Sequence, residues 1–309
     1  MGYMYHHFWD MYLYVAGLSI QSRWMLDPMS SPPSARKQRI GIELRKMRDA
    51  ADVTAAEAAA VLGLARTKIT LIEQGSYAVT PKRVMALAHR YEEADSAYVS
   101  ALAAMAGDRT KGWWEEYRGA VPPGFLEIAE FEYNAKGMCS YQICHPPGPM
   151  QTEQYSRAVF REAEPPLTPR IVETRIEHRM RRCETLMKDG AQPYTAIVHE
   201  AALRMRFGGR AVTRDQLDRM LELSHLPHVT LRVVTFESGG FVGSGQAIIY
   251  ARGDVPRLDT VQYDSVDGPI YLHSAEHLEK YRAIVDKMTN RSLSIEGSRD
   301  FIARVKKEI

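Results

Sequence analysis

The sequence predicts two domains of different fold class: an all-α N-terminal domain, followed by an α+β C-terminal domain with a mostly antiparallel sheet. Short amphipathic segments separated by helix-capping residues fill residues 35–107, whereas strand-like runs first appear at Tyr194. The length of 309 residues fits about two domains. We therefore expect an atypical arm over residues 1–34, a helical domain over 35–107 and an α+β domain over 108–309.

The helical region opens on an amphipathic helix from Ala35 to Ala51. Its apolar stripe repeats at steps of four, three and four residues, and its other face is strongly basic. Later, Thr80 followed by Pro81 forms an N-cap with proline at the first helical position. Asp95 can cap a further helix that runs to about Met105.

The segment from Thr54 to Gly75 reads as two short helices joined by a glycine turn. Thr54 and Glu57 have the spacing of a capping box, which starts the first of these helices. Gly63 ends it, since a left-handed turn penalises a side chain. Two helices in this arrangement form the DNA-binding helix-turn-helix unit.

The second helix of this unit carries polar side chains near its start, where such helices contact base edges in the major groove. Arginine can form a bidentate pair with guanine, threonine can contact thymine, and lysine suits guanine or phosphate. The alternative is a solvated face in an ordinary helical domain. The predicted DNA-binding residues are Arg66, Thr67, Lys68, Thr70, Thr54 and Tyr77.

The charge distribution agrees with a double-stranded DNA partner. Between Ala35 and Tyr91, eleven Lys and Arg residues face five Asp and Glu residues, a net charge of +6, whereas the whole chain carries only +2. Positive charge is thus concentrated in the segment that would release counterions from phosphates.

The C-terminal region begins with the paired Trp113 and Trp114, which are followed by two prolines and a short acidic helix. Two longer helices come next, and a helix from about Thr213 to Leu226 separates the first two strands. Two helices, roughly Ala275–Met288 and Ile295–Lys307, close the chain. The expected strands are Tyr194–Val198, Val229–Phe236, Ala247–Tyr250, Thr260–Tyr263 and Ile270–Leu272.

Composition favours a cytoplasmic protein without a membrane segment. Three cysteines are too few, and odd in number, for a disulfide framework. The first 28 residues lack the basic start of a secretory signal, and the apolar run from Met11 to Ile20 is too short to span a bilayer. Our preferred interpretation is that translation starts at Met29 and that the arm is disordered or misassigned; an aromatic arm that packs on a partner is the alternative.

Signals for an enzyme or a metal site are weak, so we predict neither, and no cofactor. His199-Glu200 lacks the second histidine of a zinc-protease helix because Leu203 stands there. The glycine-rich run 237–246 lacks the Gly-Lys-Ser/Thr end of a phosphate-binding loop. Its glycines also do not have the spacing of a nucleophile elbow. Zinc needs three or four ligands. Neither the pair His273 and His277 nor the group Cys139, Cys144 and His145 clearly supplies them.

The five-helix order resembles the lambda-repressor-like, or Xre-type, helix-turn-helix fold. GWWEEY, PPGF, PGPMQTEQYSRAVF, RIEHRMRRCETL, LPHVTLRVVTF and DGPIYLHSAEHLEKYRAIVDKM resemble actinobacterial regulators of this type whose C-terminal domain has unknown function and is considered antitoxin-like. The resemblance runs from about Ala35 to Ile309, and it implies a small partner protein encoded nearby. This chain departs from the pattern at Ala55, Ala58 and Leu71, where the family usually has glutamine, leucine and arginine.

These observations favour a sequence-specific transcriptional regulator that binds DNA as a homodimer, with a C-terminal domain that senses or binds a partner. Two-fold symmetry would double the interface and place half-sites about 34–36 Å apart. We expect the second domain, with Trp113 and Trp114 at its start and its two closing helices, to supply much of the dimer contact or to present a groove to the small partner. An antitoxin-like protein that sequesters a small partner and regulates its own gene is the alternative, and an enzyme that the DNA-binding unit only localises is a weaker one.

Overall fold

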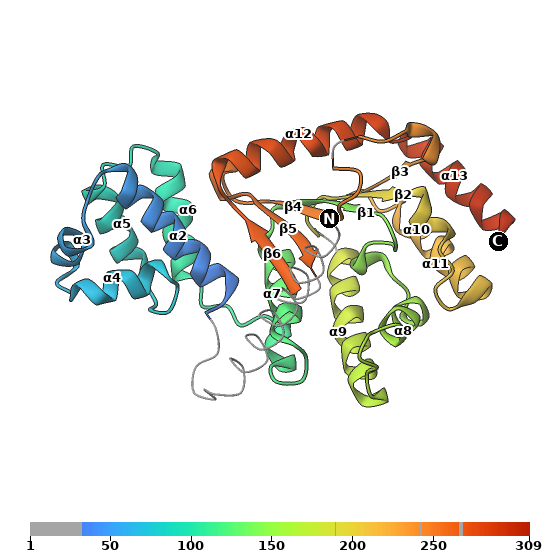
Figure 1. The fold of residues 1–309 in the computed structure, drawn as a ribbon, viewed down its shortest axis with the longest axis horizontal. Coiled ribbons are helices and arrows are strands. Elements are labelled where there is room, and N and C mark those ends of the chain that lie inside the picture. The colour runs from blue at the N-terminus through green and yellow to red at the C-terminus, as the bar shows by residue number, and fades with distance from the viewer. Residues whose placement is uncertain (1–32, 189, 242, 266–267) are drawn as a thin grey trace, which may run out of the picture.

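The computed structural model describes residues 33–188, 190–241, 243–265 and 268–309. The expectation for the N-terminal arm therefore lies almost entirely outside the described residues. Figure 1 shows a bundle of helices on one side of a larger α/β body. No helix in the described part of the chain is both long and apolar enough to cross a membrane.

Helices α2–α6 form the bundle, which we call the headpiece. Their bounds are α2 Ala35–Ala50, α3 Ala55–Leu62, α4 Arg66–Glu73, α5 Pro81–Arg90 and α6 Ser96–Gly107. Side chains cap four of them, because Ser34, Thr54, Thr80 and Asp95 each accept a hydrogen bond from a backbone amide in the first turn. One core of buried apolar side chains joins all five headpiece helices: α2, α4, α5 and α6 contribute large side chains, including Leu44, Ile69, Ile72, Leu87 and Leu102, and α3 contributes the small Ala58 and Ala59.

The larger body is built on one six-stranded sheet in the order β3-β2-β1-β4-β5-β6. The strands are β1 Gly137–Gln142, β2 Tyr194–His199, β3 Val229–Val234, β4 Ile248–Arg252, β5 Thr260–Ser265 and β6 Gly268–Leu272. Its helices are α7 Pro123–Asn134, α8 Glu153–Arg161, α9 Pro169–Met187, α10 Glu200–Arg204, α11 Gly209–Leu223, α12 Ala275–Arg291 and α13 Ile295–Glu308. Short 3₁₀ turns are η1 Trp113–Tyr117, η2 Gly148–Met150, η3 Phe236–Ser238 and η4 Pro256–Leu258.

Helices cover both faces of this sheet (Figure 1). Tyr194, Ala196 and Val198 of β2 pack in one core with α11 and α13, whereas the intervening Ile197 packs with α12 in the other. This alternation follows from the two-residue period of a strand. Both faces of β2 are therefore buried.

The prediction of a mostly antiparallel sheet is wrong: the sheet is mixed. Strands β1, β2 and β3 pair in parallel, and β4, β5 and β6 continue from β1 in antiparallel fashion. The reason lies in the connections. Helices α8 and α9 connect β1 to β2, and α10 and α11 connect β2 to β3, which gives the long crossovers that parallel neighbours require.

Two further local expectations need correction. Strand β1 lies where the parallel half of the sheet meets the antiparallel half, yet its sequence GMCSYQ gives no strand signal. In α9, helical spacing places Ile171, Ile176, Met180 and Leu186 on or near one apolar stripe, but this stripe is only partly buried, because Ile171 is 39% exposed. The buried positions of this helix are Ile176 and Leu186 of that stripe together with Val172, His178, Arg182 and Cys183.

Candidate nucleic-acid interface

The helix-turn-helix unit consists of α3, the turn at Gly63, and α4. At Thr54 the capping box is complete: the Glu57 amide donates to Thr54 Oγ1 at 3.2 Å, and the Thr54 amide donates to Glu57 Oε2 at 2.8 Å. The hydrogen bond from the Thr54 amide lowers the pKa of Glu57. Gly63 has the left-handed angles φ 62° and ψ 36°, as the turn requires.

Helix α4 turns one face into the core and the other outward. Ile69 and Ile72 are each 1% exposed and anchor it in the headpiece. On the outer face Arg66, Thr67 and Thr70 are exposed, and their side chains make no hydrogen bond or ion pair with any residue that the structure describes. These side chains are therefore free to bind a ligand. Ala65 occupies the N-cap without a side-chain hydrogen bond, so the first turn of α4 also keeps free amides.

The other predicted DNA-binding residues have partners within the chain. Lys68 Nζ lies 4.5 Å from the centroid of the Tyr77 ring, a cation–π contact that holds the ammonium group beside α4. Tyr77 itself is half-buried against the headpiece core. Thr54 is exposed, but its hydroxyl takes part in the capping box and also donates to Glu57. The structure thus brings Arg66, Lys68 and Tyr77 to one region, with Thr54 at the start of α3.

A further basic residue adjoins this region. Gly75 has φ +74°, and an ideal Cβ placed on it would lie 2.7 Å from the Gln38 backbone nitrogen and 2.8 Å from the Lys37 carbonyl carbon. The loop after α4 therefore packs tightly against the first turn of α2. This contact places the exposed Lys37 beside the helix-turn-helix unit. In the sequence, only the glycine at position 75 indicated this contact between the loop and α2.

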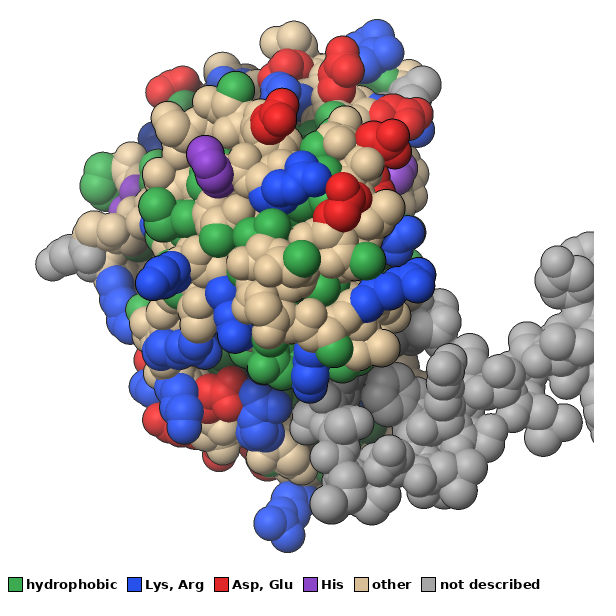
Figure 2. Space-filling view, turned by 90° about the vertical axis from the view of Figure 1, so that its left-hand side faces the viewer, with side chains coloured by type: hydrophobic (Ala, Val, Ile, Leu, Met, Phe, Trp, Pro, Cys, Tyr) green, Lys and Arg blue, Asp and Glu red, His purple; other side chains and the backbone are tan. Residues whose placement is uncertain are grey.

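Figure 2 shows the headpiece side of the molecule, with Lys and Arg gathered over its lower part and most Asp and Glu over its upper part. Much of the predicted basic excess is neutralised within the chain. Ion pairs with acidic residues engage Arg36, Arg39, Arg45, Lys46, Arg48 and Arg90. The basic residues between 35 and 91 without such a pair in the described structure are Lys37, Arg66, Lys68, Lys82 and Arg83.

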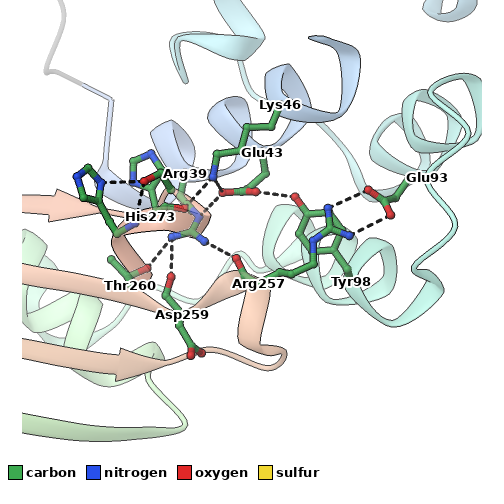
Figure 3. Close-up of polar contacts among 11 residues, drawn as sticks. Arg39, Glu43, Lys46, Glu93, Tyr98, Arg257, Asp259, Thr260 and His273 are labelled. Carbon is green, nitrogen blue, oxygen red and sulfur yellow. Dashed lines mark hydrogen bonds and ion pairs between the residues drawn. The ribbon is translucent and has the colours of Figure 1, made fainter. Parts of the chain in front are cut away.

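The basic face of α2 is largely used within the chain, since three of its cations contact residues of the C-terminal domain. Arg39, only 7% exposed, donates to the carbonyl oxygens of Asp259 at 3.0 Å and Arg257 at 2.9 Å, and to Thr260 Oγ1 at 2.7 Å (Figure 3). Lys46 Nζ donates to the His273 carbonyl at 2.8 Å. Arg36 pairs with Asp108 and with Glu130 of α7.

Glu43 stands at the centre of this junction. Its carboxylate pairs with Arg39 Nε at 2.9 Å, and it accepts hydrogen bonds from Lys46 Nζ at 2.8 Å and from Tyr98 Oη at 2.6 Å (Figure 3). From the other side, Arg257 lies 3.7 Å above the Tyr98 ring and forms two hydrogen bonds with Glu93. Leu258 of η4 is part of the headpiece core. The headpiece is therefore docked on the C-terminal domain by mutually paired groups, of which Arg39, Glu43 and Tyr98 are buried.

The candidate metal ligands do not form a cluster. His277 Nδ1 lies 2.8 Å from Ser274 Oγ, and burial lowers the pKa of His273 to about 4. Cys183 is buried, whereas Cys144 is exposed. Among the described residues, no group of three or more His, Cys, Asp or Glu side chains is arranged to hold a metal ion.

Comparison with known families agrees with this architecture. Residues 39–97 match a family described as a helix-turn-helix domain. Residues 125–304, more than half of the chain, match the family described as "Domain of unknown function (DUF5753)". The chain belongs to this family. In this DUF5753 protein, the matched region begins within α7 and contains the whole sheet, so the family domain is the α/β body. No curated protein and no solved structure matches the chain.

Proposed function

We propose that this chain is a sequence-specific transcriptional regulator that binds double-stranded DNA by inserting α4 into the major groove. The outward face of α4 is the observation that supports this most strongly. Arg66, Thr67 and Thr70 are exposed and unengaged there, while Ile69 and Ile72 fix the opposite face in the core. Helices of this kind read base edges through their first turns.

In this proposal the residues divide into base-reading and phosphate-binding groups. Arg66, Thr67 and Thr70 face bases. Lys68, held over Tyr77, and Lys37, beside Gly75, bind phosphates. Thr54 starts α3, the helix next to the groove.

We also propose that the headpiece is of the Xre, lambda-repressor-like type and that residues 35–107 and 108–309 act as separate domains. The protein would work in the cytoplasm, where its DNA would lie.

Replacement of Arg66 by alanine should weaken specific binding by about 1–3 kcal/mol, roughly 5- to 150-fold in Kd, and relax the preference at one base pair. Lys68→Ala should instead weaken binding about equally on all sequences, because phosphate contacts carry no sequence information. Fluorescence anisotropy would measure both against a duplex selected from a random pool and a scrambled duplex. Arg214→Ala, at an exposed position on α11, is the matched control. If both headpiece variants bind DNA with the affinity of the wild type, α4 does not take part in DNA recognition.

We further propose that the chain binds DNA as a homodimer, because one headpiece reads only a few base pairs. The tryptophans expected to supply the contact are used within the chain: Trp114 is 4% exposed, and Trp113 packs against Trp114, Tyr117 and His178. Sedimentation velocity with and without the selected duplex should show two chains per duplex, and footprinting should show two half-sites one helical turn apart. A single chain on one asymmetric half-site would contradict the dimer.

The antitoxin-like alternative and a small partner protein encoded nearby remain predictions from the resemblance.

A further inference from the structure

A cavity of about 550 Å³ lies where the headpiece meets the sheet. Helices α2 and α6 of the headpiece form one side, and α7 with strands β4–β6 of the DUF5753 domain forms the other. Its volume is in the range of pockets that hold small organic molecules. The function proposed above does not use it.

Most of the cavity wall is apolar. Ile42 and Met105 line it from the headpiece, and Phe131, Ile270 and Tyr271 line it from the other side. The rings of Phe131 and Tyr271 lie 5.3 Å apart at 58°, which gives an aromatic surface made by α7 and β6. Such a wall suits the apolar or aromatic body of a ligand.

The acidic groups of the wall outnumber the cations available to them. The single guanidinium of Arg36 pairs with both Asp108, at 2.5 Å, and Glu130, at 3.0 Å. Glu127, one helical turn before Glu130 and half-buried, has no hydrogen bond or ion pair with the described residues. Burial, and secondly the nearby Glu130, raises the pKa of Glu127. A bound cation would offset both effects, because an opposite charge nearby favours the ionised carboxylate.

The other basic groups of the wall do not supply that cation. Glu43 neutralises Arg39. Lys136 pairs with Asp254 at 3.3 Å, and both Lys136 and Arg252 are exposed. His273 is neutral at pH 7 because burial lowers its pKa to about 4. The half-buried part of the wall near Glu127 and Glu130 therefore carries excess negative charge beside an aromatic surface.

We propose that this cavity binds a small organic cation, a primary amine on an apolar or aromatic body. The ammonium group pairs with Glu127, and the body packs on Phe131, Tyr271 and the apolar side chains of α2 and α6. Charge-assisted hydrogen bonds from an ammonium to a carboxylate are the stronger kind, so the amine provides the selectivity.

Occupancy of this cavity should also change DNA affinity, a consequence that rests on the proposed DNA-binding function. The wall helix α2 carries α4 directly: Arg48 pairs with Glu73 at 2.6 Å, and Gly41 abuts the last turn of α4. A ligand held between α2, α6 and α7 contacts both the headpiece and the sheet domain. The ligand therefore favours the relative placement of the headpiece and the sheet domain in which it fits best.

Three fluorescent probes of similar size test the inference on the full chain without DNA. Dansylcadaverine carries an amine, N-hexyl dansylamide is neutral, and N-dansyl-6-aminohexanoate is an anion. The amine should bind about tenfold or more tightly than the other two, since tenfold is the effect of one modest charged contact. Glu127→Gln should abolish this preference and leave the neutral probe unaffected. Glu279→Gln, at an exposed position on α12, is the matched control.

A second variant tests the location. Ala104 lines the cavity from α6 and is exposed, so tryptophan there fills the cavity without entering the headpiece core. Ala104→Trp should abolish binding of all three probes. Equal binding of the probes, preference for the anion, an amine preference that survives Glu127→Gln, or binding that survives Ala104→Trp would overturn the inference. Because these titrations contain no DNA, their outcome is independent of the DNA-binding proposal, and a separate anisotropy titration with the amine probe tests the coupling.

Discussion

Replacement of Glu43 by alanine is expected to lower the free energy of unfolding by about 3–5 kcal/mol, the usual cost of removing one partner from a buried ion pair. Glu43 is 3% exposed and Arg39 is 7% exposed, so water cannot replace the lost carboxylate. Burial already lowers the pKa of Arg39, and Glu43 is the main group that opposes this shift. The variant also deprives Tyr98 Oη and Lys46 Nζ of their acceptor.

Denaturant unfolding of Glu43→Ala beside Glu279→Ala, an exposed helical glutamate, would measure this effect. The physical cause can be separated from simple loss of volume. If the unpaired Arg39 is responsible, then Arg39→Met combined with Glu43→Ala should be more stable than Glu43→Ala alone, because no buried charge is left without a partner. A double variant as unstable as the sum of the two single changes would contradict this explanation.

The headpiece was the most predictable part of the chain because its signals are local. Caps at Thr54, Thr80 and Asp95, and the left-handed glycine at position 63, act within one helical turn. The predicted bounds of five strands of the second domain also agree closely with the observed ones. The direction of their pairing was not, since it depends on which distant strands become neighbours. Strand β1 was missed because it includes Gly137 and Ser140 and lies between β2 and β4, so its sequence shows no regular polar alternation.

The exposed face of α4 was predictable from the sequence, its surroundings were less so, and its role in DNA binding stays a prediction. The face of α4 follows from helical periodicity, which separates Arg66, Thr67 and Thr70 from Ile69 and Ile72. Sequence could not show that Arg36, Arg39 and Lys46 contact the C-terminal domain, because their acceptors lie up to 227 positions away. Nor could it show the cavity, whose walls come from both parts of the chain.

The α2–α4 contact gives the second large expected effect, through Gly41. This glycine is buried within α2, and an ideal Cβ on it would lie 2.4 Å from the Ile72 carbonyl oxygen and 2.5 Å from that of Glu73. In an ordinary helix, glycine to alanine gains up to about 1 kcal/mol. Here the added methyl meets backbone atoms that cannot rotate away, so α4 must move relative to α2. We expect Gly41→Ala to destabilise the protein by about 1–3 kcal/mol, the range found for overpacked cores.

The same change should weaken DNA binding, because the displaced helix is the one proposed to read the bases. Gly245→Ala is a suitable control, since a Cβ at that position meets no heavy atom within 4 Å. Thermal unfolding and anisotropy with the selected duplex would be measured on both variants. A loss of stability with unchanged DNA affinity would show that α4 keeps its place while the core absorbs the strain. An unchanged unfolding midpoint would show instead that the close α2–α4 approach is not maintained in solution.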